Sequence, residues 1–401
     1  MWSNQTFWIL PLPDRSGGVK EIQGEMNFAG FTISSHIENQ LGATMVPQHK
    51  ILFSAVAAFL AAASSCLPAQ QQATPSAEPS HALAAVKLGD KWGFIDKKGK
   101  LVIPARFEFT TGFYQQLAAV TIGKKTGYID RSGRLVIPAQ FDFGFPFFDQ
   151  LADVSLGGKN GYIDKTGKIV IQPQFASPSE FVEGLANVKI NGKWGYIDKT
   201  GKTVIPFQFE GAGSFSEGLA GVKVGNKWGF IDKTGKMIIQ PQFSDNEWLQ
   251  TGWFKQGRAS VFLGDKCGFI DKAGKTVIPI RFELCRAFSE ELAAVGIGGK
   301  IGFVDAAGKM VIQPKFDEAW SFQEQIAAVR IGDKWGFIDK TGKLVIAARF
   351  DSAGSFSEGL ADVGIGAKFG AIGGKHGYID KTGKIIIPLQ FDSAQPFRRL
   401  D

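Results

Sequence analysis

The chain has 401 residues, a formal net charge of +7 and, outside its first 81 residues, a single histidine, His376. We therefore do not expect a histidine-based catalytic triad or a multi-histidine metal site, because too few histidines are available to build one. The 45 basic and 38 acidic side chains are interleaved, so a field strong enough to hold nucleic acid is not expected. We expect no catalytic residue, no metal, no cofactor and no nucleic-acid partner.

Residues 45–66, MVPQHKILFSAVAAFLAAASSC, have the parts of an export signal: a basic start, an apolar run and a small-residue end. The apolar run is about 13 residues long, against the roughly 20 that a spanning helix needs. Its end resembles the bacterial lipobox, in which the cysteine is lipidated, although Ala63 stands where that motif usually has Leu. We expect a lipid anchor on Cys66; secretory cleavage to a soluble secreted or periplasmic form and an uncleaved anchor are the alternatives.

Residues 1–44 precede this signal, whereas a signal peptide belongs at the N-terminus. We interpret them as a mis-assigned, unstructured extension, with Met45 as the true start; an irregular but real segment is the alternative. Residues 67–81 are rich in Ala, Gln, Pro and Ser. Such a composition cannot bury enough apolar surface to offset its ordering entropy, so we expect a flexible linker.

Residues 82–401 contain nine copies of one unit, which we expect to form one repeat domain. A glycine recurs at intervals of 34, 34, 34, 34, 39, 34, 34 and 41 residues. These glycines are Gly93, Gly127, Gly161, Gly195, Gly229, Gly268, Gly302, Gly336 and Gly377. A fixed period of this length predicts one supersecondary unit per copy.

Each copy is predicted to form a three-stranded antiparallel meander followed by a Phe-bearing crossover. In the copy at 185–218 the predicted strands are 185–190, 194–197 and 203–205. The pair Asn191-Gly192 is typical of two-residue hairpins, and Pro206 ends the pairing because it lacks a donor. Asp198, with Gly201 three residues later, favours a type I turn with a glycine bulge.

One meander is too small to be stable alone, so the copies must stack or form a ring. We expect an all-β, propeller-like array; an open β-solenoid is the alternative. The array begins on a first strand near Ala84 and stops just after a third strand, at Phe397. This phase shows no obvious split blade that would close a ring.

The recurring W-G-F/Y-I-D-K-T-G-K resembles the bacterial WG-repeat family, also called KWG repeats, over residues 84–397. That family has no general catalytic activity, so the resemblance implies a non-enzymatic protein. A weaker likeness to the aromatic hairpins of bacterial cell-wall-binding repeats implies a choline or glycan ligand. The tryptophan position itself varies and is replaced by Thr126, Asn160, Cys267, Ile301 and His376.

This variation predicts a part-exposed position, because a fully buried site would not readily accept Asn or Thr. Two insertions, around residues 244–258 and 365–377, break the period and map to loops, which often carry the working face. The candidate ligand face is Trp92, Trp194, Trp228, Trp335, Trp248, Trp253 and Phe254. The alternative is that each tryptophan only covers its own hairpin and that the insertions are neutral.

One aspartate in each copy opens the turn between the second and third strands. These are Asp96, Asp130, Asp164, Asp198, Asp232, Asp271, Asp305, Asp339 and Asp380. Each has basic neighbours and no second carboxylate in its turn, so we interpret them as turn caps rather than calcium ligands. Cys267 and Cys285 could form a disulfide after export, but two buried thiols are favoured.

These features predict a non-enzymatic scaffold, exported to the cell envelope, that binds a protein or polysaccharide partner and contacts the membrane through its anchor. A structural spacer without a defined ligand is the first alternative. The second is an envelope hydrolase that uses carboxylates such as Glu180, Glu217 and Glu358. Two such carboxylates close together, with raised pKa values, would favour the hydrolase.

Overall fold

The computed structural model describes residues 6–13, 19–26, 82–244, 253–366 and 374–398. Strands β1 (Thr6–Pro13) and β2 (Val19–Met26) pair as an antiparallel hairpin, regular structure that the composition of residues 1–44 did not predict. Cys66 and the linker lie outside the described residues. No helix within the described part of the chain is long and apolar enough to cross a membrane.

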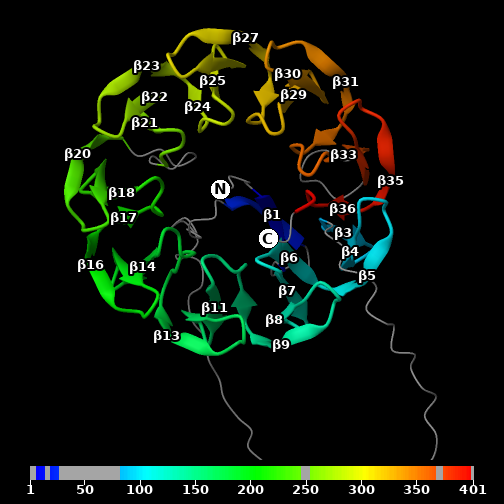
Figure 1. Cartoon of the computed structure of the whole chain (residues 1–401), viewed down its shortest axis with the longest axis horizontal. Helices are drawn as coiled ribbons and strands as arrows, with labels where there is room; N and C mark the ends of the chain where they lie inside the picture. The colour runs from blue at the N-terminus through cyan, green and yellow to red at the C-terminus, as the bar shows by residue number, and fades with distance from the viewer. Residues whose placement is uncertain (1–5, 14–18, 27–81, 245–252, 367–373, 399–401) are drawn as a thin grey trace, which may run out of the picture. The chain divides into compact units, whose positions relative to one another are not determined.

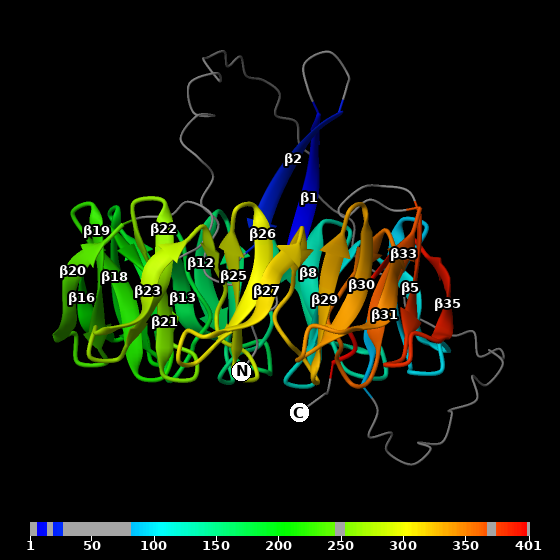
Figure 2. The same cartoon turned by 90° about the horizontal axis from the view of Figure 1, so that it is seen from above.

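Over the described residues from 82 onward, the repeats form nine small antiparallel sheets, the blades of a β-propeller (Figure 1). The propeller interpretation is confirmed over the solenoid. A typical blade contains the predicted meander plus a short innermost strand, which is made by the crossover from the preceding copy. Figure 2 shows the third strands of the meanders, such as β27, β31 and β35, along the outside of the ring.

In each blade the strands are given from the innermost outward. The first blade contains β36 (Ser393–Ala394), β3 (Ala84–Leu88), β4 (Lys91–Ile95) and β5 (Leu101–Phe107), and the second contains β6 (Phe109–Tyr114), β7 (Leu117–Ile122), β8 (Lys125–Ile129) and β9 (Leu135–Phe141). The third contains β10 (Phe143–Gly144), β11 (Ala152–Leu156), β12 (Lys159–Ile163) and β13 (Ile169–Phe175). The fourth to sixth blades are β14 (Leu185–Ile190), β15 (Lys193–Asp198) and β16 (Thr203–Phe209); β17 (Gly211–Ala212), β18 (Leu219–Val224), β19 (Lys227–Asp232) and β20 (Met237–Phe243); and β21 (Arg258–Leu263), β22 (Lys266–Asp271) and β23 (Thr276–Phe282). The last three are β24 (Leu284–Cys285), β25 (Leu292–Ile297), β26 (Lys300–Asp305) and β27 (Met310–Phe316); β28 (Glu318–Ala319), β29 (Ile326–Ile331), β30 (Lys334–Asp339) and β31 (Leu344–Phe350); and β32 (Ser352–Ala353), β33 (Ala361–Ile365), β34 (Lys375–Ile379) and β35 (Ile385–Phe391).

The ring closes in the first blade, where the C-terminal strand β36 pairs with β3. The pairing is extended by backbone hydrogen bonds from the Gln395 N–H to Ala85 O and from the Arg398 N–H to Leu83 O. The expectation of no split blade is therefore wrong. The final crossover, which looked like a tail after a complete meander, supplies the fourth strand of the first sheet.

The glycine after the tryptophan position is needed because the third strand passes close to it. A Cβ at Gly195 would lie 2.7 Å from the carbonyl oxygen of Ile205. The register shifts at this point, between the Trp194 and Tyr196 pairs, as expected for a bulge. This glycine therefore lets the third strand bend across the blade.

The turn that follows joins neighbouring blades. Asp164 Oδ1 accepts hydrogen bonds from the backbone N–H groups of Thr166 and Lys168, at 2.9 and 3.1 Å. Gly167 has a φ of 85°, and a Cβ there would lie 2.8 Å from Ile137 Cγ2 of the preceding blade. Glycine is thus required both for the turn and for the interblade contact.

Crossover phenylalanines lie between blades. Phe215 packs on Tyr196 of the fourth blade, with ring centroids 5.0 Å apart, and shares a buried cluster with Val222 of the fifth. The same pairing recurs between Phe303 and Phe322, at 4.9 Å. Much of the apolar core therefore lies at the seams between blades.

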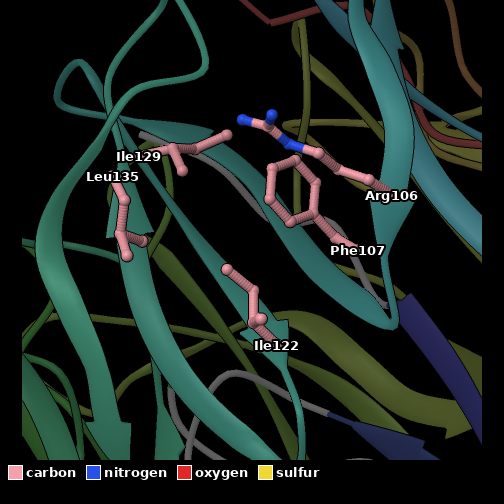
Figure 3. Close-up of a pocket in the computed structure, with 5 residues that line it drawn as sticks. All are labelled: Arg106, Phe107, Ile122, Ile129 and Leu135. Atoms are coloured by element: carbon pink, nitrogen blue, oxygen red, sulfur yellow. The ribbon is translucent and has the colours of Figure 1, made fainter. Parts of the chain in front are cut away.

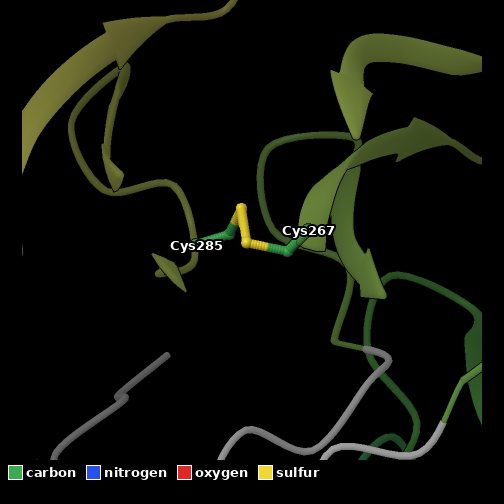
Figure 4. The surroundings of a disulfide bond; sticks show 2 residues. All are labelled: Cys267 and Cys285. Carbon is green, nitrogen blue, oxygen red and sulfur yellow. A yellow bond between two sulfur atoms is a disulfide. The ribbon is translucent and has the colours of Figure 1, made fainter. Parts of the chain in front are cut away.

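Cys267 and Cys285 form a disulfide, so the expectation of two buried thiols is wrong (Figure 4). Cys267 lies on β22 of the sixth blade, whereas Cys285 lies on β24, the innermost strand of the seventh. Their Cα atoms are 6.0 Å apart, a separation that a disulfide can span. The crossover brings Cys285 back beside Cys267 because it forms the first strand of the next sheet.

Candidate functional site

The residues of the expected ligand face do not form one exposed surface. Trp92, Trp335 and Phe254 are only 7, 2 and 1 % exposed, so for these three the expectation is wrong. Three others, Trp194, Trp228 and Trp253, are half-buried, and Trp248 lies outside the described residues.

The tryptophan position lies against the innermost strand of its own blade. A Cβ at Gly211 would lie 3.0 Å from the Trp228 ring. Because the residue opposite it differs from copy to copy, the space available to the ring also differs. The residue on the innermost strand does not by itself account for the substitutions, since Ser393 lies on the Trp92 side of its blade and Ser352 lies on the His376 side of its own.

Trp320, which was not among the predicted residues, is half-buried and contacts an aromatic ring and a guanidinium group. Its ring lies parallel to that of Trp335, with centroids 5.9 Å apart, and the Arg286 guanidinium lies 4.8 Å from its centroid. Its Nε1 donates to the carbonyl oxygen of Ala353 at 3.2 Å. It stands where other copies have a small residue such as Gly354, a departure from the repeat that could have identified it in the sequence.

Most carboxylates of the crossovers join neighbouring blades. Glu217 accepts a hydrogen bond from the Gly257 N–H at 3.0 Å and pairs with Lys272 at 3.2 Å. Burial opposes ionisation of Glu217, but these partners outweigh it and lower its pKa. Glu358 likewise pairs with Lys97 at 3.1 Å. Glu217 therefore lacks the raised pKa that the hydrolase interpretation required.

Asp153 and Glu180 differ from these structural carboxylates. Asp153 is 4 % exposed; burial raises its pKa well above the usual range, and the charge of Glu180 raises it further. Burial also raises the pKa of Glu180 to about 7. Neither residue has an ion pair with a described residue. Strongly perturbed, uncompensated carboxylates are typical of functional sites.

Aromatic and basic side chains lie beside this pair. Burial raises the pKa of Tyr114, an effect that Arg398 opposes and Glu180 strengthens. The Arg398 guanidinium lies 4.3 Å from the centre of the Tyr114 ring. Phe143 and Phe145, on and just after β10, are half-buried with ring centroids 4.8 Å apart.

We call Tyr114, Phe143, Phe145, Asp153, Glu180 and Arg398 the inner cluster. They come from innermost strands, from the strands next to them and from crossovers of the first four blades. Aromatic rings can stack on a sugar ring or hold an apolar side chain, and carboxylates accept hydrogen bonds from hydroxyl or ammonium groups. The sequence pointed to Glu180, but the other five have no signal in the repeat pattern.

Comparison with known families gives a direct match. The model described as WG containing repeat matches residues 92–125, 127–159, 161–194, 194–228, 228–267, 268–300, 301–335, 335–369 and 377–399. The chain belongs to the WG-repeat family. No curated protein matches this WG-repeat chain.

Among solved structures, the WG-repeat chain is similar in fold to one described as the eukaryotic initiation factor. The TM-score is 0.58 with 11 % identity, covering 78 % of this chain and 98 % of the other. It is also similar to dihydro-heme d1 dehydrogenase NirN in complex with DHE. There the TM-score is 0.50 with 12 % identity, covering 83 % of this chain and 78 % of the other. At such low identity these likenesses show the propeller fold alone.

The WG-repeat propeller also has a small open hollow between its first two blades (Figure 3). It has a volume of about 110 Å³ and is lined by Arg106, Phe107, Ile122, Ile129 and Leu135. The lining is mostly apolar and includes no carboxylate. Within the described residues, no group of three or more His, Cys, Asp or Glu side chains is placed to hold a metal ion.

Proposed function

We propose that this WG-repeat protein is an exported scaffold, lipid-anchored at Cys66, that binds a protein or polysaccharide partner of the cell envelope through the inner cluster. The observation that carries the proposal is the pair Asp153 and Glu180. These carboxylates lie beside half-buried aromatic rings without a basic partner among the described residues. A ligand with hydroxyl or ammonium groups would provide the missing partners.

The disulfide supports the exported location. Bridges such as Cys267–Cys285 form and persist in oxidising compartments and are rare in the reducing cytosol. The signal-like segment 45–66 agrees with this location. The intact mass of the protein from its native cells tests the anchor, because acylation adds a fixed mass to the peptide that begins at Cys66.

Sedimentation with purified peptidoglycan sacculi tests the polysaccharide form of the proposal. Phe145→Ser should weaken binding about tenfold or more, as expected for loss of a central aromatic contact. Phe207→Ser is the matched control, because Phe207 is also half-buried but lies on the outer strand β16. Equal effects of the two substitutions would exclude the inner cluster as the binding site.

Photo-crosslinking in intact cells tests the protein form, with the crosslinker placed at position 145 and, as the control, at position 207. A discrete adduct from position 145 alone supports a protein partner. If sacculi do not bind and neither position gives an adduct, the scaffold is a structural spacer.

The Asp153–Glu180 pair also favours one second candidate, an envelope glycoside hydrolase. A carboxyl group with a pKa near 7 can act as a general acid beside a second carboxylate. Release of reducing ends from sacculi would support this activity if Glu180→Gln abolished it. Binding of sacculi without any release would exclude it.

A further inference from the structure

Three outer strands each begin with two exposed aliphatic side chains. These are Leu101 and Val102 on β5, Leu344 and Val345 on β31, and Ile385 and Ile386 on β35. All six side chains are between 38 and 44 % exposed. The other outer strands of the described blades have at most one exposed aliphatic residue at these two positions.

These strands are far apart in the sequence but follow one another around the ring, because closure places the first blade beside the ninth (Figure 1). A Cβ at Gly383 would lie 3.0 Å from Ile346 Cγ2 on β31, and one at Gly99 would lie 3.0 Å from Ile387 Cγ2 on β35. The turns that begin β35 and β5 therefore each contact the preceding outer strand. We call the six residues the rim patch.

A lysine directly precedes each aliphatic pair: Lys100, Lys343 and Lys384. Other lysines of the same turns have ion pairs, such as Lys381 with Glu324 at 3.1 Å. Lys100, Lys343 and Lys384 have no ion pair within 4.0 Å among the described residues. The rim patch is thus an apolar strip edged by lysines that make no close ion pair among the described residues, and Lys343 and Lys384 act only more weakly on the pKa of Asp339 and Asp380 in their own turns.

The propeller begins at Ala82, at the end of the first blade where the outer strand β5 also begins. Residues 67–81 separate Cys66 from Ala82, which immediately precedes the first blade. In that blade Ala84 pairs with Ile95, and Ile95 pairs with Leu101. The chain therefore enters at the end of the blade where the outer strand begins.

We propose that the rim patch docks on the anionic lipid surface to which Cys66 tethers the chain. This inference rests on the proposed lipid anchor. Aliphatic side chains enter the boundary between headgroups and acyl chains, while the neighbouring lysines contact lipid phosphates. An anchor at Cys66 alone does not determine which side of the propeller faces the membrane, and a second contact of this kind would hold it in a fixed orientation.

The test places a polarity-sensitive fluorophore on Ile386→Cys and adds vesicles of phosphatidylglycerol and phosphatidylethanolamine. Emission should shift to the blue, and phosphatidylcholine vesicles should give a smaller shift. Val204→Cys is the matched control, because Val204 is 39 % exposed on β16, away from the patch. Equal shifts at the two positions, or no shift at position 386, would overturn the proposal.

A second measurement excludes an effect of the label. In the full chain with Cys66→Ser, vesicle binding should fall about tenfold or more when Leu101, Val345 and Ile386 are all changed to Ser. The same number of substitutions at Val170, Val204 and Val311, which are similarly exposed, should leave binding unchanged. Unchanged binding in both variants would also overturn the proposal.

The native mass of the Cys66 peptide separates this proposal from the proposed anchor. An acylated Cys66 without a blue shift at position 386 refutes the rim patch alone. A blue shift with an unmodified Cys66 refutes the anchor alone.

Discussion

The Nδ2 of Asn187 donates a 3.0 Å hydrogen bond to the carbonyl oxygen of Ala212 in the next blade. Asp362 occupies the place of Asn187 in its own copy, so a carboxyl group there can donate only when it is protonated. Burial raises the pKa of Asp362 to about 7. We therefore expect the seam at Asp362 to be sensitive to pH.

Asp362→Asn should stabilise the protein above neutral pH. The pKa of Asp362 is raised in the folded state. Its contribution to the free energy of unfolding is therefore fully present below its unfolded pKa of about 4 and is lost as the pH rises to about 7. At pH 8 we expect a gain of about 1 to 2 kcal/mol, discounted for partial exposure, and little gain at pH 4. Urea unfolding at the two pH values measures it; an equal gain at both would contradict the assignment. Asn187→Asp should have the opposite effect.

Gly195→Ala should destabilise the fourth blade by about 2 to 4 kcal/mol, because the added methyl group would meet the backbone of the third strand. Gly213→Ala is the matched control, since the nearest atom to its added Cβ would lie at 3.7 Å. Thermal unfolding of both variants checks the difference. Similar losses would show that the effect is one of glycine flexibility rather than of this contact.

Reduction of the Cys267–Cys285 bridge should lower stability by about 3 kcal/mol, as expected for a closed loop with a sequence separation of 18 residues. Unfolding with and without reductant measures the loss. The double variant Cys267→Ala/Cys285→Ala should be insensitive to reductant. If reductant left the stability of the wild-type protein unchanged as well, the two thiols would not be bridged.

Gln395→Pro should open the ring, because proline removes the N–H that donates to Ala85 O at 2.9 Å. We expect a loss of about 3 kcal/mol. Gln395→Ala keeps this N–H and loses only the side-chain bond to Thr110 O, so its cost should be about 1 kcal/mol. Limited proteolysis of the first blade reports the opening; equal cleavage of the two variants would argue against closure through β36.

Local signals in the sequence were enough to identify the meander. The pair Asn191-Gly192 places the hairpin between the first two strands, and Pro206 places the end of the third strand to within a few residues. The part played by the crossover was not evident, because a two-residue strand such as β36 has no periodicity to detect. This omission explains both the missed closure and the unexpected bridge at Cys285. Five of the six residues of the inner cluster were missed for a related reason: positions such as Phe145 and Asp153 differ from copy to copy, and only the ring brings these side chains together.

Linear arrays of repeats need distinct end units, because the outward face of each terminal copy would otherwise expose its apolar residues to water. Here Ile103 of the first blade lies against Gly133 of the second, and Ile387 of the ninth against Gly99 of the first. Every copy therefore has a neighbour on both sides. The first and ninth copies can keep the same apolar residues as the middle ones, and the chain needs no capping sequence.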